Sequence, residues 1–156
     1  MKTVIFKFEG VLFQKQKNGD FALRCGTRFL LKELKIRQIQ SLLIQETRSL
    51  DVGFYLTKFN LNNYFKSKNI VWVKNHVSDK IISNFYQNIM ELTKLEPENC
   101  LVFEDNISGI RAARKAKIGN IVALVSASDK YKYLNLTEVD DVINNFHQFN
   151  RLLLRT

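Results

Sequence analysis

Short apolar runs recur along the chain, and most of their residues are β-branched or aromatic. Each run is followed by polar residues, which is the pattern of a buried strand that ends in a loop. The predicted strands cover residues 3–6, 41–44, 70–73, 100–103 and 121–125, with a short sixth at 142–143. Between the first two strands, the polar stretch 14–24 contains Asn18-Gly19, a pair that favours a small hairpin.

Helical patterns separate these strands. Thr27 is expected to cap a helix that carries Phe29, Leu30, Leu31 and Leu34. Further helices are predicted at about 50–59, at 79–94, where apolar residues stand at 81, 82, 85, 89 and 92, and at 108–117. Strands that alternate with helices favour a parallel sheet covered on both faces. The predicted fold is α/β, a three-layer Rossmann-like sandwich with five or six strands, and we expect residues 1–156 to form one domain.

Composition narrows the class of protein. The chain is 46% apolar, which is enough for a hydrophobic core and excludes a disordered or fibrous protein. Cys25 and Cys100 stand far apart with no partners at metal-ligand spacing, so we expect two buried thiols in a reducing compartment. No apolar run approaches the roughly 20 residues that cross a bilayer. The first strand starts beside Met1, so no cleavable targeting segment is expected.

The net charge of +9 points to an acidic partner. An excess of this size favours contact with an acidic protein surface, a nucleic acid or an anionic membrane. Because the basic residues are scattered along the chain, direct RNA binding stays an alternative and not the first expectation. The pI near 9.6 favours a mitochondrial assembly over a cytoplasmic one.

Residues suited to binding or catalysis follow four of the predicted strands. In a doubly wound sheet, ligands bind beyond the carboxyl ends of the strands, so these residues are the candidate site. They are Lys7 and Glu9 after the first strand, Thr47 after the second, Lys80 after the third, and Glu104 and Asp105 after the fourth.

The stretches around these residues resemble the motifs of the haloacid dehalogenase (HAD) phosphatases. Residues 4–12 are similar to the first HAD motif, a hydrophobic strand followed by D-x-D-G-[TV]. Residues 100–113 resemble the fourth motif of the β-phosphoglucomutase-like branch, a strand followed by E-D-S-x-x-G-I-x-A-A. The segment 60–65 is similar to the N-L-x-x-Y-F that follows the second motif. Counting from these segments places Thr47 at the Ser/Thr of the second motif and Lys80 at the lysine of the third.

The resemblance implies a mechanism, and this chain departs from it. In the family the first aspartate attacks phosphorus, and the aspartate two residues later is the general acid and base. The first aspartate and the carboxylates of the fourth motif hold Mg²⁺, while the Ser/Thr and the lysine hold phosphoryl oxygens. Here the two positions of covalent chemistry are Lys7 and Glu9. Thr47 and Lys80 are then a vestigial phosphate site, and Glu104 and Asp105 a vestigial metal site.

Lys7 is the decisive difference. An ammonium group offers only donors and cannot ligate Mg²⁺, and nearby carboxylates keep it charged. We therefore expect Lys7 to stand where the metal would be, in an ion pair with Asp105 or Glu104, and we expect no cofactor. Two alternatives stay open at this stage: Lys80 as an ordinary first-turn lysine, and Thr47 as a turn or cap residue.

The stretches 8–46 and 48–79, where HAD enzymes carry a cap domain, are too short to hold one beside the helices of the core. The sequence thus predicts a capless, catalytically inactive HAD-like protein, a pseudoenzyme that serves as a structural or interaction subunit of a larger assembly. The first alternative is a Mg²⁺-dependent phosphatase or phosphotransferase that uses Glu9 on a macromolecular phosphate. The second is an RNA-binding component of a ribonucleoprotein.

Overall fold

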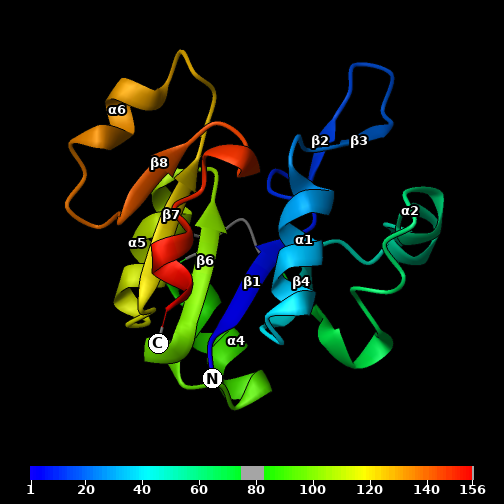
Figure 1. The fold of residues 1–156 in the computed structure, drawn as a ribbon, viewed down its shortest axis with the longest axis horizontal. Helices are drawn as coiled ribbons and strands as arrows, with labels where there is room; N and C mark the ends of the chain where they lie inside the picture. The colour runs from blue at the N-terminus through cyan, green and yellow to red at the C-terminus, as the bar shows by residue number, and fades with distance from the viewer. Residues whose placement is uncertain (75–82, 156) are drawn as a thin grey trace.

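The computed structural model of the chain describes residues 1–74 and 83–155, and its core is one sheet of six parallel strands (Figure 1). The strand order is β5-β4-β1-β6-β7-β8. Their bounds are β1 (Thr3–Lys7), β4 (Gln40–Gln45), β5 (Ile70–Trp72), β6 (Cys100–Glu104), β7 (Asn120–Leu124) and β8 (Asp141–Ile143). The chain first builds outward from β1 to β5 and then returns to β6 beside β1. The switch in strand order therefore lies at β1 and β6, where an α/β sheet opens its ligand crevice.

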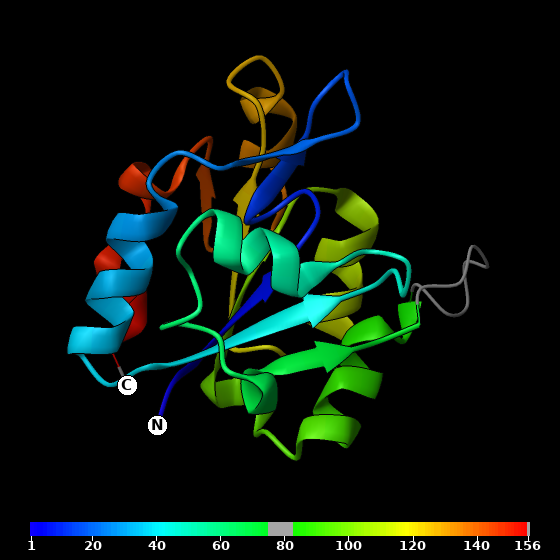
Figure 2. The same ribbon diagram turned by 90° about the vertical axis from the view of Figure 1, so that its right-hand side faces the viewer.

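Helices cover both faces of the sheet, which confirms the predicted three-layer α/β architecture (Figure 2). The helices are α1 (Thr27–Ile36), α2 (Val52–Lys58), α4 (Phe85–Thr93), α5 (Ile107–Lys115) and α6 (Lys130–Leu134). Four short 3-10 turns are η1 (Ser67–Asn69), η2 (Pro97–Asn99), η3 (Phe146–Gln148) and η4 (Arg151–Leu154). None of the described helices is long and apolar enough to span a membrane.

Side chains along each strand alternate between the two faces. On β1, Val4 and Phe6 pack with α1 and α2, whereas Ile5 packs with α4 and α5. Both faces are buried, which explains why these strands are continuous apolar runs in the sequence. Phe6 stacks on Phe103 of β6, with ring centroids 5.5 Å apart. A stacked aromatic pair thus immediately precedes Lys7 and Glu104, which end these two strands at the switch point.

Two helices differ in detail from their predictions. Thr27 is the first residue of α1 and not its cap, because Gly26 is at the N-cap and the Thr27 hydroxyl donates to the Arg24 carbonyl at 2.7 Å. On α4, Tyr86 and Met90 are buried, whereas Leu92 is 64% exposed. Residues 79–82 of the predicted helix 79–94 lie outside the described residues.

The stretch between β1 and α1 holds a hairpin, as Asn18-Gly19 predicts. It is made of β2 (Phe13–Lys15) and β3 (Phe21–Leu23), and Gly19 has a φ of 87° at its turn. The hairpin and α6 project beyond the carboxyl ends of the strands, at the top of Figures 1 and 2. The rest of the described chain between the motifs forms elements of the core itself. Cys100 is buried as expected, but Cys25, in the turn before α1, is exposed, so the expectation of two buried thiols was wrong for Cys25.

Candidate functional site

Lys7 is a buried cation surrounded by carboxylates. It is the last residue of β1 and points to the same face of the sheet as Ile5, toward α4 and α5. Its Nζ lies 3.2 Å from Oε2 of Glu104, 3.2 Å from Oδ1 of Asp105 and 3.9 Å from Oε1 of Glu46. The ion pair expected of Lys7 is therefore present, and it joins the two neighbouring strands β1 and β6.

The charges around Lys7 keep it protonated. Burial alone would lower the pKa of Lys7, but the carboxylates, Glu104 first, outweigh burial and hold that pKa above its ordinary value of 10.5. An amine attacks phosphorus only through a free lone pair, which the ammonium lacks. Lys7 in this setting is a fixed positive charge and not a nucleophile.

Glu104 ends β6 and is fully buried. Burial raises the pKa of Glu104, while the charge of Lys7 and the hydrogen bond from Tyr86 act in the opposite direction. Tyr86 Oη donates to Oε1 at 2.6 Å, and Lys7 binds Oε2. Burial and the same carboxylate raise the pKa of Tyr86 well above its ordinary value, so its hydroxyl remains a donor. Each oxygen of Glu104 thus has a partner, as a buried carboxylate requires.

The start of α5 fixes Asp105. Asn106 is the N-cap of α5: its Oδ1 accepts from the Gly109 N–H at 2.7 Å, and its Nδ2 donates to Asp105 Oδ1 at 3.0 Å. A Cβ on Gly109 would overlap the carboxyl group of Glu104, and a Cβ on Gly10 would overlap that of Asp105. The two glycines therefore let the backbone close against both carboxylates.

Arg24 fixes the loop after β1. Its side chain is buried and donates from Nε to the Val11 carbonyl at 2.8 Å and from Nη2 to the Gly10 carbonyl at 2.7 Å. Burial lowers the pKa of Arg24, and the charge of Asp105 works against that effect. This anchor holds Gly10 against Asp105 and places the neighbouring Glu9 at the rim.

The structure brings together only part of the predicted set. Lys7, Glu104 and Asp105 meet at the switch point, but Glu9 is exposed on the loop. At the end of β4, Glu46 and not Thr47 is the residue that approaches Lys7. Thr47 is exposed in the following turn, where its carbonyl accepts from Nε2 of Gln45 at 3.0 Å. Lys80 lies outside the described residues.

Two cavities flank the ion pair. One of about 350 Å³ opens on the side of α4 and α5 and is lined by Lys7, Glu46, Phe85, Glu104, Asn106, Ser108 and Gly109. The other, of about 510 Å³, lies under the β2–β3 hairpin, with Glu9, Arg24, Asp105, Ser126, Asp129 and Tyr133 among its lining residues. Asp105 thus has the ion pair on one side and a polar, open cavity on the other.

These residues do not fit the Mg²⁺ ion that the HAD motifs imply. A Mg²⁺ site needs oxygen ligands with free lone pairs around one point. Here that point is taken by the Lys7 ammonium, which would repel a cation by several kcal/mol at intermediate dielectric. Among the described residues, no group of three or more His, Cys, Asp or Glu side chains is arranged to hold a metal ion.

Sequence reasoning missed three contributors: Glu46, Tyr86 and Arg24. Glu46 carries a usable signal, because it is an acidic residue two positions after the predicted strand 41–44. Tyr86 lies beside the predicted apolar face of its helix, and Arg24 lies at the end of a polar stretch. Tyr86 and Arg24 reach the site through tertiary packing alone.

A parallel, doubly covered sheet with charged residues at its switch point defines a Rossmann-like α/β protein whose site lies at the strand ends. The family model of the haloacid dehalogenase-like hydrolases matches residues 5–123. The chain therefore belongs to this family, as residues 4–12 and 100–113 indicate. No curated protein sequence matches the chain.

Solved structures with the same fold include hydrolases of this family. A HAD hydrolase of family IA, variant 3, from Entamoeba histolytica has a TM-score of 0.74 at 16% identity, over 99% of this chain and 97% of that one. A putative β-phosphoglucomutase from Thermotoga maritima gives 0.70 at 20% identity, over 92% and 94%. CbbY from Rhodobacter sphaeroides, solved with phosphate, gives 0.71 at 15% identity, over 94% and 95%. Identities this low establish the fold alone.

Proposed function

We propose that this chain is a HAD-family protein without phosphoryl-transfer activity, retained as an interaction subunit of a larger assembly. One observation carries the proposal: the Lys7 ammonium lies between Glu104 and Asp105, at 3.2 Å from each. The family nucleophile is replaced by a cation that also neutralises the metal-binding carboxylates. Lys7 then stabilises the fold in the place of the ion and dispenses with Mg²⁺.

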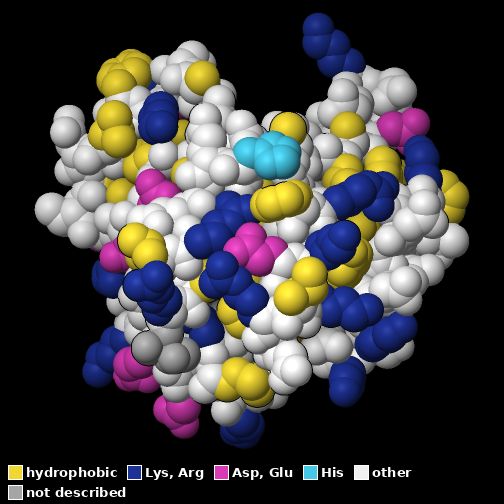
Figure 3. All heavy atoms as spheres, viewed as in Figure 1, with side chains coloured by type: hydrophobic (Ala, Val, Ile, Leu, Met, Phe, Trp, Pro, Cys, Tyr) yellow, Lys and Arg dark blue, Asp and Glu magenta, His cyan; other side chains and the backbone are white. Residues whose placement is uncertain are grey.

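An open basic face supports the interaction role. Helix α1 exposes Arg28, Lys32 and Lys35, and its C-cap residue Arg37 is also exposed. Lys and Arg side chains outnumber acidic ones over the centre and right of this face in Figure 3. Its Glu33 is neutralised by Arg37 at 2.7 Å and by Arg151 at 2.9 Å. Phe29, 60% exposed, adds apolar surface. An acidic protein surface is the partner whose charge complements this face.

A phosphatase assay tests the loss of activity. The purified chain is incubated with p-nitrophenyl phosphate and Mg²⁺ beside the Glu104→Gln and Asp105→Asn variants. We expect no hydrolysis above that of the variants, because the described site offers no nucleophile. Mg²⁺-dependent hydrolysis that both substitutions abolish would contradict the proposal.

The interaction role needs a separate experiment. We expect affinity purification at native expression level to recover a stable complex, and the double variant Arg28→Glu/Lys32→Glu to lose it. The matched control is Lys15→Glu/Lys17→Glu, which reverses two exposed charges on the β2–β3 hairpin. If the α1 variant still recovered the complex, docking of the partner through this face would be contradicted.

A second candidate is a Mg²⁺-dependent phosphatase or phosphotransferase acting on a macromolecular phosphate. The position of Glu9 favours it, because this exposed carboxylate lines the open cavity of about 510 Å³ beside Asp105. An acid–base residue there would face a bulky substrate directly, since the element that lines the described part of the cavity from above is only the short β2–β3 hairpin. Loss of the measured hydrolysis in Glu9→Gln, as well as in Asp105→Asn, would establish this alternative.

A further inference from the structure

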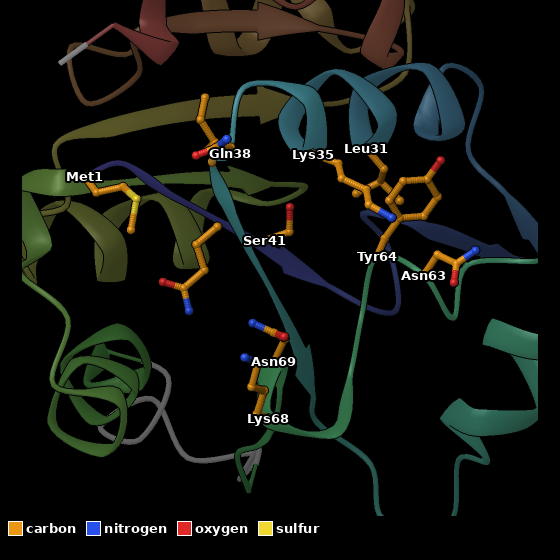
Figure 4. A pocket seen from close by; sticks show the side chains of 11 residues that line it. Met1, Leu31, Lys35, Gln38, Ser41, Asn63, Tyr64, Lys68 and Asn69 are labelled. Carbon is orange, nitrogen blue, oxygen red and sulfur yellow. The ribbon is translucent and has the colours of Figure 1, made fainter.

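A polar groove of about 410 Å³ lies at the amino ends of the strands, at the opposite end of the sheet from Lys7. It is formed by the end of α1, the start of β4 and the segment 63–69 that leads into β5. Figure 4 shows Lys35 and Tyr64 on one side, Lys68 and Asn69 on the other, and Ser41 between them. The charged residues of the HAD motifs at Lys7, Glu104 and Asp105 lie at the other end of the sheet, and only the segment 60–65 of the family pattern reaches the groove, through Asn63 and Tyr64.

The groove carries a positive charge that no acidic residue among its described lining residues balances. Lys35 and Lys68 both line it and are exposed, and no described carboxylate does. The carboxyl end of α1 also points here and carries about half a negative charge. That half charge is smaller than the two full positive charges, and the N–H groups of Gln38 and Ile39 already bond α1 carbonyls. The groove therefore attracts an anion.

The remaining side chains suit a ligand with a ring and several polar atoms. The Tyr64 ring is half-buried in the wall, and the Lys35 Nζ is 5.8 Å from its centroid. Gln40 Oε1 accepts from the Thr3 hydroxyl at 3.3 Å, so its amide nitrogen is the end left to donate to a ligand. Ser41 supplies a hydroxyl beside it, and Leu31 supplies an apolar wall.

We propose that this groove binds a small phosphate-bearing ligand with a planar ring, of the size of a mononucleotide. Lys35 and Lys68 bind the phosphate, the face of Tyr64 stacks on the ring, and the amide and hydroxyl groups bind its polar edge. The volume falls within the range of roughly 300–1,000 Å³ that small-molecule sites occupy. The site is separate from the Lys7 ion pair, and it shares Lys35 with the basic face of α1.

Titration of the ¹⁵N-labelled chain with AMP, followed by NMR at constant ionic strength, tests the proposal. We expect shifts of the Ser41, Tyr64 and Asn69 amides, and at least a tenfold weaker Kd in Lys35→Gln/Lys68→Gln. Lys17→Gln, at an exposed lysine of the β2–β3 hairpin outside the groove, should leave the Kd within twofold. Adenosine and inorganic phosphate, titrated separately, should each bind more weakly than AMP. The same spectra report whether each variant is folded.

Several results would overturn the proposal. A Lys17→Gln variant that loses as much affinity as the double variant would mean that AMP is attracted diffusely by surface charge. Adenosine or inorganic phosphate binding as tightly as AMP would mean that ring and phosphate are not recognised together. Displacement of AMP by a short uridine oligonucleotide, with a steep dependence on salt, would assign the face to RNA. Absence of shifts at millimolar AMP would remove the site altogether.

Discussion

The Tyr86 hydroxyl donates to Oε1 of Glu104 at 2.6 Å, and both side chains are fully buried. This bond completes a chain from α4 to β1, because the other oxygen of Glu104 is held by Lys7. Among the described residues, no buried side-chain nitrogen or oxygen lacks a hydrogen-bond partner. A carboxylate and an ammonium are stable inside this fold because every polar atom around them is engaged.

Replacing Tyr86 by Phe should therefore destabilise the protein. The substitution keeps the ring and removes the hydroxyl that donates to Glu104 Oε1, which leaves this buried carboxylate oxygen without that partner. We expect a loss of about 1–3 kcal/mol in the free energy of unfolding, measured by urea denaturation. Tyr131→Phe, at a residue that is 66% exposed, is the control and should change it by less than about 0.5 kcal/mol. Equal effects at the two positions would contradict a structural role for the bond.

The ion pair predicts a specific dependence of stability on alkaline pH. The pKa of Lys7 is raised above 10.5, so the native state keeps a proton that the unfolded chain loses above that pH. The stability that Lys7 contributes is fully present below about pH 10.5 and is lost as pH rises further. The raised pKa of Tyr86 acts with the same sign. Comparing the free energies of unfolding of wild type and Lys7→Met isolates the part of this pH dependence that is due to Lys7.

Urea unfolding of both proteins at about pH 8 and about pH 11 measures the contribution of Lys7 to this pH dependence. At the lower pH, Lys7→Met should be less stable by about 3–5 kcal/mol, because Glu104 is then a buried charge without its cation. The difference between the two proteins should shrink at the higher pH. A difference that stays constant, or that grows with pH, would show that the native-state pKa of Lys7 is not raised.

The strands were predictable from the sequence, and the exact helix faces were not. All six predicted strands are present with ends within two residues, because strands buried on both faces are continuous apolar runs. On α4, helical spacing placed Leu92 on the buried face, whereas Tyr86 takes that role. A tyrosine with a buried hydrogen-bond acceptor packs as a core residue, and the acceptor belongs to a distant strand.

The site was predictable where it rests on strand ends. Lys7, Glu104 and Asp105 each directly follow or end a buried strand, and parallel strands bring those ends together. Thr47 was placed by counting residues across a segment without strong motifs. Thr47 is exposed in the turn after β4, and Glu46 before it approaches Lys7. Arg24 was missed because its partners are backbone carbonyls, which carry no sequence signal.

Gly10 and Gly19 form a matched pair for testing how tightly Asp105 is packed. Both have left-handed backbones, with φ of 85° and 87°, so alanine should cost about 1–2 kcal/mol of strain at either position. Only at Gly10 does the new Cβ overlap the Asp105 carboxyl group, since nothing lies within 4 Å at Gly19. Gly10→Ala should thus cost about 1–3 kcal/mol more than Gly19→Ala in thermal or urea unfolding. Equal losses would mean that Asp105 moves aside freely.

Replacing Lys7 by Asp tests whether the lysine stands in for a metal ion. The substitution removes the cation and adds a carboxylate beside Glu46, Glu104 and Asp105, so four acidic groups would meet at one buried point. Like charges this close repel one another, and we expect a Tm clearly below that of wild type in the presence of EDTA. Carboxylates grouped in this way are the oxygen ligands that Mg²⁺ prefers.

Mg²⁺ should then restore much of the lost stability to Lys7→Asp, because an ion that binds only the native state stabilises it by mass action. A thermal scan with and without Mg²⁺ measures the effect. Wild type should show no shift, since its ammonium already neutralises Glu104 and Asp105. Lys7→Met is the control that lacks both the cation and the new carboxylate, and it should respond less than Lys7→Asp. If Mg²⁺ raised the Tm of wild type and of Lys7→Asp by the same amount, the ion would be binding at another site. Lys7 would then not stand in for a metal ion.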